Sequence, residues 1–132
     1  MLSFFGQNWF YTFNQSRQPA GELGQIIATI EALKNNNAID AERIFAVGMS
    51  SGGAMAHNFS ACYPDYFKGV AVHSGLAFKV AENVTEANTV LTSDLQKSPK
   101  VLGKLAADCS DLPVTEHKLE KLLVIHGQKD TR

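Results

Sequence analysis

The stretch Arg43-Ile-Phe-Ala-Val-Gly-Met-Ser-Ser-Gly-Gly53 decides the fold of this chain. Its uncharged apolar run, residues 44–47, is typical of a strand that is buried on both faces of a parallel sheet. Residues 48–52 then match the pattern Gly-x-Ser-x-Gly, and small apolar residues follow at helical spacing. A strand, a tight turn with a serine and a helix form the context in which this pattern holds a nucleophile. The stretch therefore predicts an α/β fold with Ser50 at the carboxyl end of a strand.

The residue types in this turn suit acyl transfer. A serine hydroxyl is a weak nucleophile that must be presented to the substrate and to a base, and a sharp turn does this for Ser50. The helix that follows directs free N–H groups toward a developing oxyanion, and the N–H of Ser51 is the expected donor. The alternative is a purely structural contact between helix and sheet. A phosphate-binding loop is excluded because no Lys-Ser/Thr pair follows the glycines.

Working outward from this turn, further periodic segments predict alternating helices and strands. Apolar residues at spacings of three and four predict a helix over Pro19–Lys34, and another helix over Ser51–Cys62 ends before Pro64. Short apolar runs predict buried strands at Lys68–His73 and Leu122–Ile125. Residues 77–120 are harder to interpret, with short helices expected at 84–88 and 99–107. The order of segments indicates parallel strands with flanking helices.

The longest similarity lies in residues 43–75, which read RIFAVGMSSGGAMAHNFSACYPDYFKGVAVHSG. This stretch resembles the polyhydroxybutyrate depolymerase-type esterases of the α/β-hydrolase fold, a family with feruloyl- and acetylxylan-esterase-like members. The segments Asn-Trp-Phe at 8–10 and KLLVIHGQKD at 121–130 are also similar to that family. The resemblance implies a serine esterase that works through an acyl-enzyme on polyhydroxyalkanoate or plant-wall feruloyl or acetyl esters, with no cofactor or metal. It also implies that residues 77–120 form a cap-like insertion.

Three further residues are candidates for the site. Asp130 follows the third predicted strand, where the fold places the acid of its triad, and the alternative is a surface turn. His73 ends the second predicted strand, near the mouth of the expected site, so it contacts substrate or simply packs. Trp9 lines the approach to the site by resemblance, whereas large aromatic residues more usually serve burial.

The triad histidine is missing from the expected place. In this fold the histidine follows the acid, but all four histidines of the chain precede Asp130. No early strand or loop supplies the second oxyanion donor either. We therefore expect residues 1–132 to be one incomplete α/β-hydrolase domain that is inactive in isolation. The alternatives are a catalytically inactive remnant or binding protein, and a serine peptidase or thioesterase of the same fold.

Composition limits the other classes of function. With 12 basic and 13 acidic residues the net charge is −1, so no basic surface for nucleic acid is expected. No apolar run has the length of a membrane span. The first ten residues lack the basic start of a signal peptide, although the parent protein could still be exported. Cys62 and Cys109 match no metal motif; the sequence favours Cys62 as a small buried residue, with a disulfide as the alternative in an exported protein.

Overall fold

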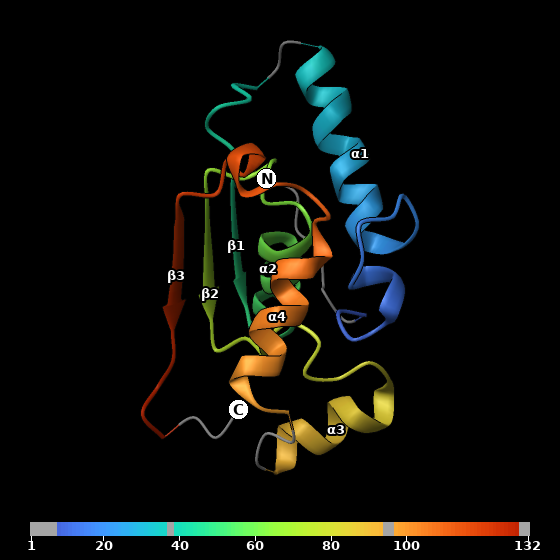
Figure 1. Cartoon of the computed structure of the whole chain (residues 1–132), viewed down its shortest axis with the longest axis vertical. Helices are drawn as coiled ribbons and strands as arrows, with labels where there is room; N and C mark the ends of the chain where they lie inside the picture. Colours follow the sequence, from blue (N-terminus) through green and yellow to red (C-terminus); the bar gives the residue numbers. More distant parts are fainter. Residues whose placement is uncertain (1–7, 37–38, 94–96, 130–132) are drawn as a thin grey trace.

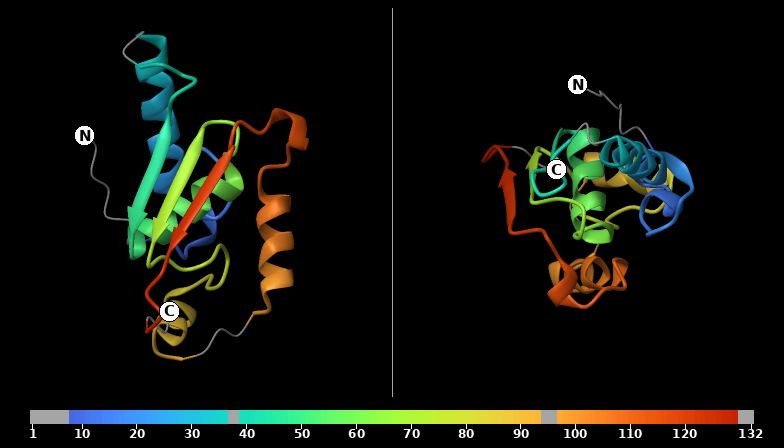
Figure 2. Two further views of the ribbon diagram at one scale, coloured as in Figure 1. Left: turned by 90° about the vertical axis from the view of Figure 1, so that its left-hand side faces the viewer. Right: turned by 90° about the horizontal axis from the view of Figure 1, so that it is seen from above.

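A computed structural model of the chain describes residues 8–36, 39–93 and 97–129. Three parallel strands form one sheet in the order β1 (Phe45–Met49), β2 (Gly69–His73) and β3 (Lys121–Ile125). The helices lie on one side of this sheet, which leaves the other side uncovered by the described residues (Figures 1 and 2). The three predicted strands are thus confirmed, and the arrangement agrees with a partial α/β-hydrolase fold.

The strand register aligns the carboxyl ends of all three strands. Met49 of β1 is paired with His73 of β2, and His73 is paired with Ile125 of β3. The loops that begin after these residues therefore leave the sheet at the same edge. Binding sites of open α/β sheets form at this edge, because several loops converge there.

Helix α2 (Ser51–Cys62) is the element around which the other helices pack, and it has the predicted bounds. Its face toward β1 and β2 is apolar and buried, with Ala54, Met55 and Phe59 among the core residues. Helices α1 and α4 contact it from either side. The helix ends at Cys62, with Tyr63 as its C-cap, because the proline that follows cannot continue a helical ladder.

Helix α1 (Gly21–Asn35) begins two residues later than expected. Gly21 has a φ of 79°, which a helix running through this residue from Pro19 would not allow. The buried Asn14, in the 3₁₀ turn η1 (Thr12–Asn14), accepts a hydrogen bond of 3.2 Å from the N–H of Leu23. This side chain satisfies one of the free N–H groups in the first turn of the helix.

The two helices expected within residues 77–120 are present and longer than predicted. They are α3 (Val84–Thr92) and α4 (Pro99–Cys109), and a 3₁₀ turn, η2 (Val114–Glu116), precedes β3. Asn83 caps α3 by accepting a hydrogen bond of 2.9 Å from the N–H of Glu86. Ser98 caps α4 in the same way at 3.4 Å from the N–H of Val101. These caps explain why both helices begin where they do.

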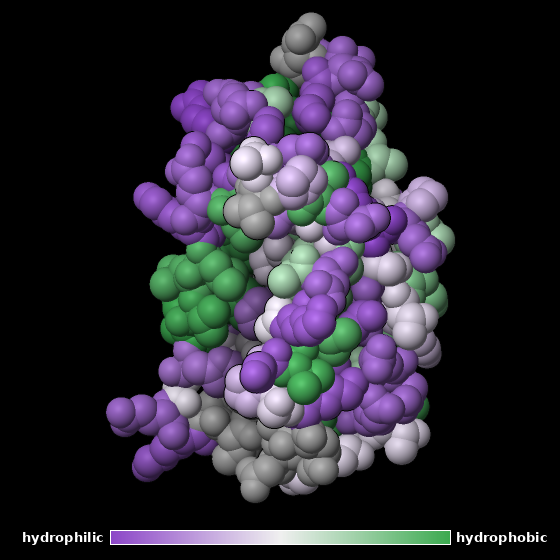
Figure 3. All heavy atoms as spheres, in the orientation of Figure 1, coloured by the Kyte–Doolittle hydropathy of each residue, from purple (hydrophilic) through white to green (hydrophobic). Residues whose placement is uncertain are grey.

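The expectation that the strands are buried on both faces is wrong for β1 and β3. Phe45, Val47 and Met49 of β1 are 61%, 81% and 68% exposed, and β3 is exposed along its whole length. The left-hand view of Figure 2 looks onto this bare face, and Figure 3 shows an apolar patch over β3. The sequence pattern was that of doubly covered strands. The helices of the described residues lie on one side of the sheet, where they partly cover alternate residues of β1 but leave both faces of β3 exposed.

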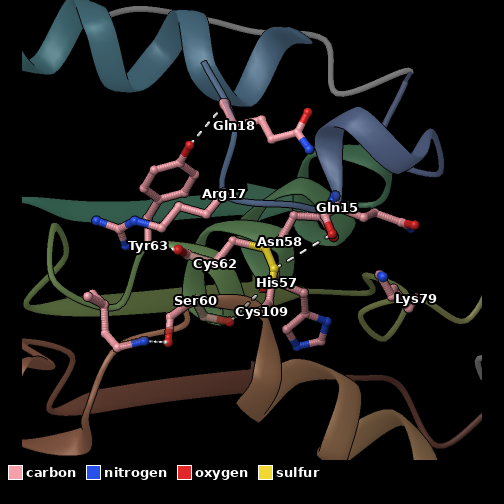
Figure 4. The surroundings of a disulfide bond; sticks show 12 residues. Gln15, Arg17, Gln18, His57, Asn58, Ser60, Cys62, Tyr63, Lys79 and Cys109 are labelled. Atoms are coloured by element: carbon pink, nitrogen blue, oxygen red, sulfur yellow. Dashed lines mark hydrogen bonds between the residues drawn. A yellow bond between two sulfur atoms is a disulfide. The ribbon is translucent and has the colours of Figure 1, made fainter. Parts of the chain in front are cut away.

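The sequence favoured Cys62 as a lone buried residue, and the structure corrects this: Cys62 and Cys109 form a disulfide (Figure 4). The bond joins the last residue of α2 to the last residue of α4. Nearby, Arg17 donates to the carbonyl of Cys62 at 3.1 Å and forms a bidentate pair with Asp65 at 2.6 Å. Sequence spacing could not reveal the pairing, because only the packing of α4 onto α2 brings the two residues together.

Loss of this disulfide should destabilise the chain markedly. The bond closes a loop of 47 residues, for which the chain-entropy model gives about 4 kcal/mol of stabilisation. We expect Cys62→Ala/Cys109→Ala to lower the free energy of unfolding by an amount of this order in urea titrations. Reductant should destabilise the wild type and leave the double variant unchanged. Equal stability of the oxidised wild type and the double variant would contradict the structural role of the bond.

Candidate active site

Ser50 occupies a strained turn between β1 and α2. Its backbone has φ 55° and ψ −120°, values that residues with a side chain rarely adopt. Its N–H donates a hydrogen bond of 2.9 Å to the carbonyl of His73, and its carbonyl accepts one of 3.0 Å from the N–H of Ala54. The backbone of Ser50 is therefore held from the sheet and from the helix at once. This is the geometry of a nucleophile elbow.

Close backbone packing around the turn of Ser50 explains the glycines at positions 48 and 75. A Cβ atom on Gly48 would lie 1.9 Å from the carbonyl oxygen of Gly52, so the first glycine of the motif has no room for a side chain. A Cβ on Gly75 would lie 2.6 Å from the backbone of Gly53, where the loop after β2 meets α2. A Cβ on Gly52, by contrast, would meet no atom within 4 Å. The two glycines of the serine motif therefore have different roles.

The N-terminus of α2 points toward the site. Ser51 is the first residue of this helix, and N–H groups of a first helical turn have no acceptor within the helix. Their aligned dipoles favour negative charge at this point. The turn thus combines a hydroxyl with backbone donors next to it. Such an arrangement can stabilise the oxyanion that forms when a serine attacks a carbonyl group.

A cavity of about 80 Å³ lies at this turn. Its walls come from α2, from the loop after β2, from the N-terminal segment and from α3, and its lining residues are Trp9, Ser50, Ser51, Ala54, Ser74, Leu76 and Leu91. The polar groups of the lining are the three serines, and the rest of it is apolar. The cavity therefore suits an uncharged group that is attached to a reactive carbonyl.

The structure brings together three of the predicted site residues. Ser50, Ser51 and Trp9 line the same cavity, and Trp9 is only 5% exposed. His73 contributes its backbone carbonyl to the elbow, but its side chain is exposed and does not line this cavity. Asp130 lies outside the described residues.

Leu91 and Ser74 are cavity residues that sequence reasoning missed. Leu91 lies on α3, and only the path of the chain after β2 carries it back to the turn of Ser50. Its sequence context is that of any surface leucine of an amphipathic helix, so no signal could have found it. Ser74 has a positive φ of 47° and follows a buried strand directly, and this position was a recognisable signal.

His57 lies seven residues after Ser50 and does not line the Ser50 cavity. Its Nδ1 is 2.7 Å from the carbonyl oxygen of Leu76. Burial lowers the pKa of His57, the hydrogen bond to Leu76 raises it in part, and the charge of His126 lowers it further. The ring borders a second, apolar cavity of about 340 Å³ between α2, α4 and Leu122 of β3. The native state therefore favours the neutral imidazole more than the unfolded chain does.

Among residues 8–36, 39–93 and 97–129, no group of three His, Cys, Asp or Glu side chains could hold a metal ion. No helix in those ranges is both long and apolar enough to cross a membrane.

Comparison with known proteins now defines the family. The model of the prolyl oligopeptidase family matches residues 3–132. The chain belongs to the prolyl oligopeptidase family. Members of this family have the α/β-hydrolase fold, in agreement with the parallel sheet and the serine elbow.

The curated relatives of this prolyl oligopeptidase family member are named for ester hydrolysis. The chain is 34% identical over 99 residues to poly(3-hydroxyalkanoate) depolymerase C of Paucimonas lemoignei, and the aligned residues make up 75% of the chain and 24% of that protein. It is 28% identical over 116 residues to feruloyl esterase B of Thermothelomyces thermophilus, covering 84% and 39%. An acetylxylan esterase of Coprinopsis cinerea is 33% identical over 66 residues, covering 50% and 18%. The chain thus spans well under half the length of these relatives.

The two glycines of the serine motif should respond oppositely to substitution by alanine. Gly48→Ala forces a Cβ into the carbonyl of Gly52, so we expect a loss of about 3 kcal/mol or more in the free energy of unfolding. Gly52→Ala has free space and removes a glycine from a helix, so a gain of about 0.5–1 kcal/mol is expected. Urea unfolding of the two variants measures both. Similar destabilisation by both substitutions would contradict the elbow geometry.

Protonation of His57 should contribute to acid destabilisation. Because its folded pKa lies below the ordinary value of 6.5, the unfolded chain binds this proton more tightly. Stability is therefore complete above about pH 7.5 and falls as the pH decreases through about 6.5 toward the folded pKa. We expect urea unfolding at about pH 5.5 to show a smaller loss for His57→Gln, whose amide can still bond to Leu76. An identical pH dependence of variant and wild type would exclude this contribution.

Proposed function

We propose that this chain carries the nucleophile of a serine carboxylic-ester hydrolase. The observation that carries the proposal is the strained backbone of Ser50 (φ 55°), held by His73 and Ala54 at the N-terminus of α2. A folded protein retains such strain where the surrounding contacts enforce it, and functional sites are where it most often occurs. The names of the relatives, which are esterases and depolymerases, support the same reaction.

The geometry supports an acyl-enzyme mechanism. The hydroxyl oxygen of Ser50 attacks the ester carbonyl carbon as its proton passes to a base, and a tetrahedral oxyanion forms. The N–H of Ser51 stabilises this oxyanion, and one such donor contributes about 2.7–4 kcal/mol to transition-state stabilisation. The intermediate then expels the alcohol, which takes the proton from the base. Water hydrolyses the acyl-serine by the same steps and releases the acid.

The base and its partner complete this proposal. Asp130 is assigned as the acid that orients the catalytic histidine and stabilises its charged form. Nδ1 of His57 lies 2.7 Å from the carbonyl oxygen of Leu76, and the side chain of His73 does not line the Ser50 cavity. All four histidines of the chain precede Asp130, whereas this fold places the base after the acid. We therefore assign the base to a histidine outside residues 1–132 in the full-length protein. We assign the second oxyanion donor likewise to a part of the full-length protein outside residues 1–132.

The substrate class follows from the relatives and from the cavity. Polyhydroxyalkanoate, feruloyl and acetylated-xylan esters are the substrates named for the relatives, and each has an uncharged acyl group. The apolar part of the cavity, including Trp9, Leu76 and Leu91, suits such a group. We assign residues 77–120 as a cap-like segment of the single domain, because α3 supplies Leu91 to the cavity. We also assign substrate contact to Trp9 and to His73 at the sheet edge.

Folding in an oxidising compartment is part of the proposal. Disulfides form and persist mainly in exported proteins. The bond between Cys62 and Cys109 lies among the packed helices, so we infer that the domain folds where this disulfide can form.

A peptidase is the second candidate, because the matching family model is described by its oligopeptidase members. Both reactions use the same elbow and the same acyl-enzyme, and they differ in the leaving group. A panel of p-nitrophenyl esters, feruloyl esters and proline-containing peptides separates them. Turnover of peptides in preference to all esters would favour the peptidase. Binding of these compounds by the full-length protein without any turnover would favour a catalytically inactive remnant or binding protein.

Substitution of the nucleophile tests the proposal directly. In the full-length protein that contains residues 1–132, Ser50→Ala should lower kcat for p-nitrophenyl butyrate by a factor of about 10⁴ or more. Ser60→Ala, on the outer part of α2, is the matched control and should retain activity. The isolated chain should show no turnover beyond background, because it lacks the base. Undiminished hydrolysis by the Ser50→Ala protein would overturn the assignment.

A further inference from the structure

Asn58 is a buried amide whose only hydrogen bond to a protein oxygen in the described residues goes to the segment that forms the site. It lies on α2, one turn before the disulfide at Cys62, and is 1% exposed (Figure 4). Its Nδ2 donates a hydrogen bond of 2.8 Å to the carbonyl oxygen of Trp9. Its Oδ1 is buried and has no hydrogen-bond partner among the described residues. Burial of an amide with only one of its polar atoms bonded is unfavourable, so the hydrogen bond to Trp9 is what partly offsets the cost of burying Asn58.

Two carbonyl groups of the segment around Trp9 accept hydrogen bonds from side chains. Residues 8–10 belong to no helix or strand. The carbonyl of Asn8 accepts bonds from the N–H of Tyr11 and from Nδ2 of Asn14, at 3.1 and 2.9 Å. The carbonyl of Trp9 has Asn58 as its donor, and the structure shows no second one in the described ranges. A buried carbonyl without a donor would be driven toward water.

Helix α2 connects this anchor with the nucleophile. Ser50 precedes the helix directly, Ala54 lines the cavity one turn further, and Asn58 follows after another turn. Ala54 and Asn58 are both buried. One rigid element therefore sets both the position of the nucleophile and the position of the aromatic wall opposite it.

We propose that Asn58 is a positioning residue that holds Trp9 in the wall of the Ser50 cavity and thereby shapes the acyl-binding side of the site. The inference rests on the proposed function for its catalytic meaning, whereas the anchoring itself does not. Loss of the amide donor releases the Trp9 carbonyl, so the segment moves toward solvent and the cavity opens beside Ser50. The elbow itself is unaffected, because its backbone is held by His73 and the surrounding glycines.

Fluorescence of the 132-residue chain reads the position of Trp9 directly, because the chain has a single tryptophan. Asn58→Leu keeps the volume and removes the donor. We expect its Trp9 emission to shift to longer wavelength and its acrylamide quenching constant to rise several-fold, with the helical circular dichroism retained. Ser60→Ala removes a hydroxyl that bonds to the carbonyl of His57 on the same helix, and it should leave the emission unchanged. Wild-type emission and quenching in folded Asn58→Leu would overturn the proposal.

Asn58→Asp gives a second test, within one protein, should the leucine variant fail to fold. A protonated carboxyl group can donate to the Trp9 carbonyl as the amide does, whereas an ionised one cannot. The emission of this variant should therefore be native at low pH and should shift as the carboxyl group ionises. The wild type over the same pH range corrects for titration of the neighbouring His57. Emission of Asn58→Asp that follows the wild type at every pH would overturn the proposal.

Kinetics of the full-length protein then distinguish this inference from the proposed function. In Asn58→Leu we expect KM for p-nitrophenyl butyrate to rise several-fold and kcat to change little, since the elbow is intact. A role in stability alone would lower the amount of folded enzyme and leave KM unchanged. Shifted fluorescence together with full hydrolysis by Ser50→Ala would reject the proposed function and retain the anchoring. Loss of activity in Ser50→Ala together with unshifted Trp9 fluorescence in Asn58→Leu would retain the proposed function and reject the anchoring.

Discussion

The hydrogen bond from the Ser50 amide to the carbonyl of His73 is the interaction on which the site depends. It ties the turn after β1 to the end of β2, and it does so at a residue with a positive φ. The conformation is maintained because Gly48 lets the carbonyl of Gly52 approach to a distance that no side chain would permit. The strain at Ser50 is thus offset by the packing of a helix against a sheet edge, and the hydroxyl is left facing the cavity.

Helix α2 extends this constraint through the domain. Its first residue, Ser51, lines the cavity, its middle contacts the core, and its last residue forms the disulfide with α4. Two chain segments that are far apart in sequence contact this helix: the segment around Trp9 and the segment of residues 77–120. The cavity at Ser50 is therefore formed by remote segments that one rigid helix positions relative to one another.

Much of the fold could be predicted because its signals are local. Short apolar runs, capping residues and Pro64 determine where strands and helices begin and end, and the bounds of α2 were predicted to the residue. The turn of Ser50 was equally visible, since the strand, the Gly-x-Ser-x-Gly pattern and the helix that define it are all local signals. The exposed faces of β1 and β3 were not predictable, because an apolar run shows that a strand can be buried but not what covers it.

By itself the sequence determined the order of elements, and it predicted Ser50, Ser51 and Trp9 as candidate site residues. The order of elements and the two serines rest on periodicity, turn chemistry and motif spacing, all of which act over a few residues, whereas Trp9 was predicted by the family resemblance. Only the tertiary structure decided that Cys62 bonds to Cys109, that Leu91 reaches the cavity and that Asn58 holds Trp9. The disulfide and the bond from Asn58 to Trp9 each join residues more than 40 positions apart, and such a contact depends on how whole helices pack, which no local pattern encodes.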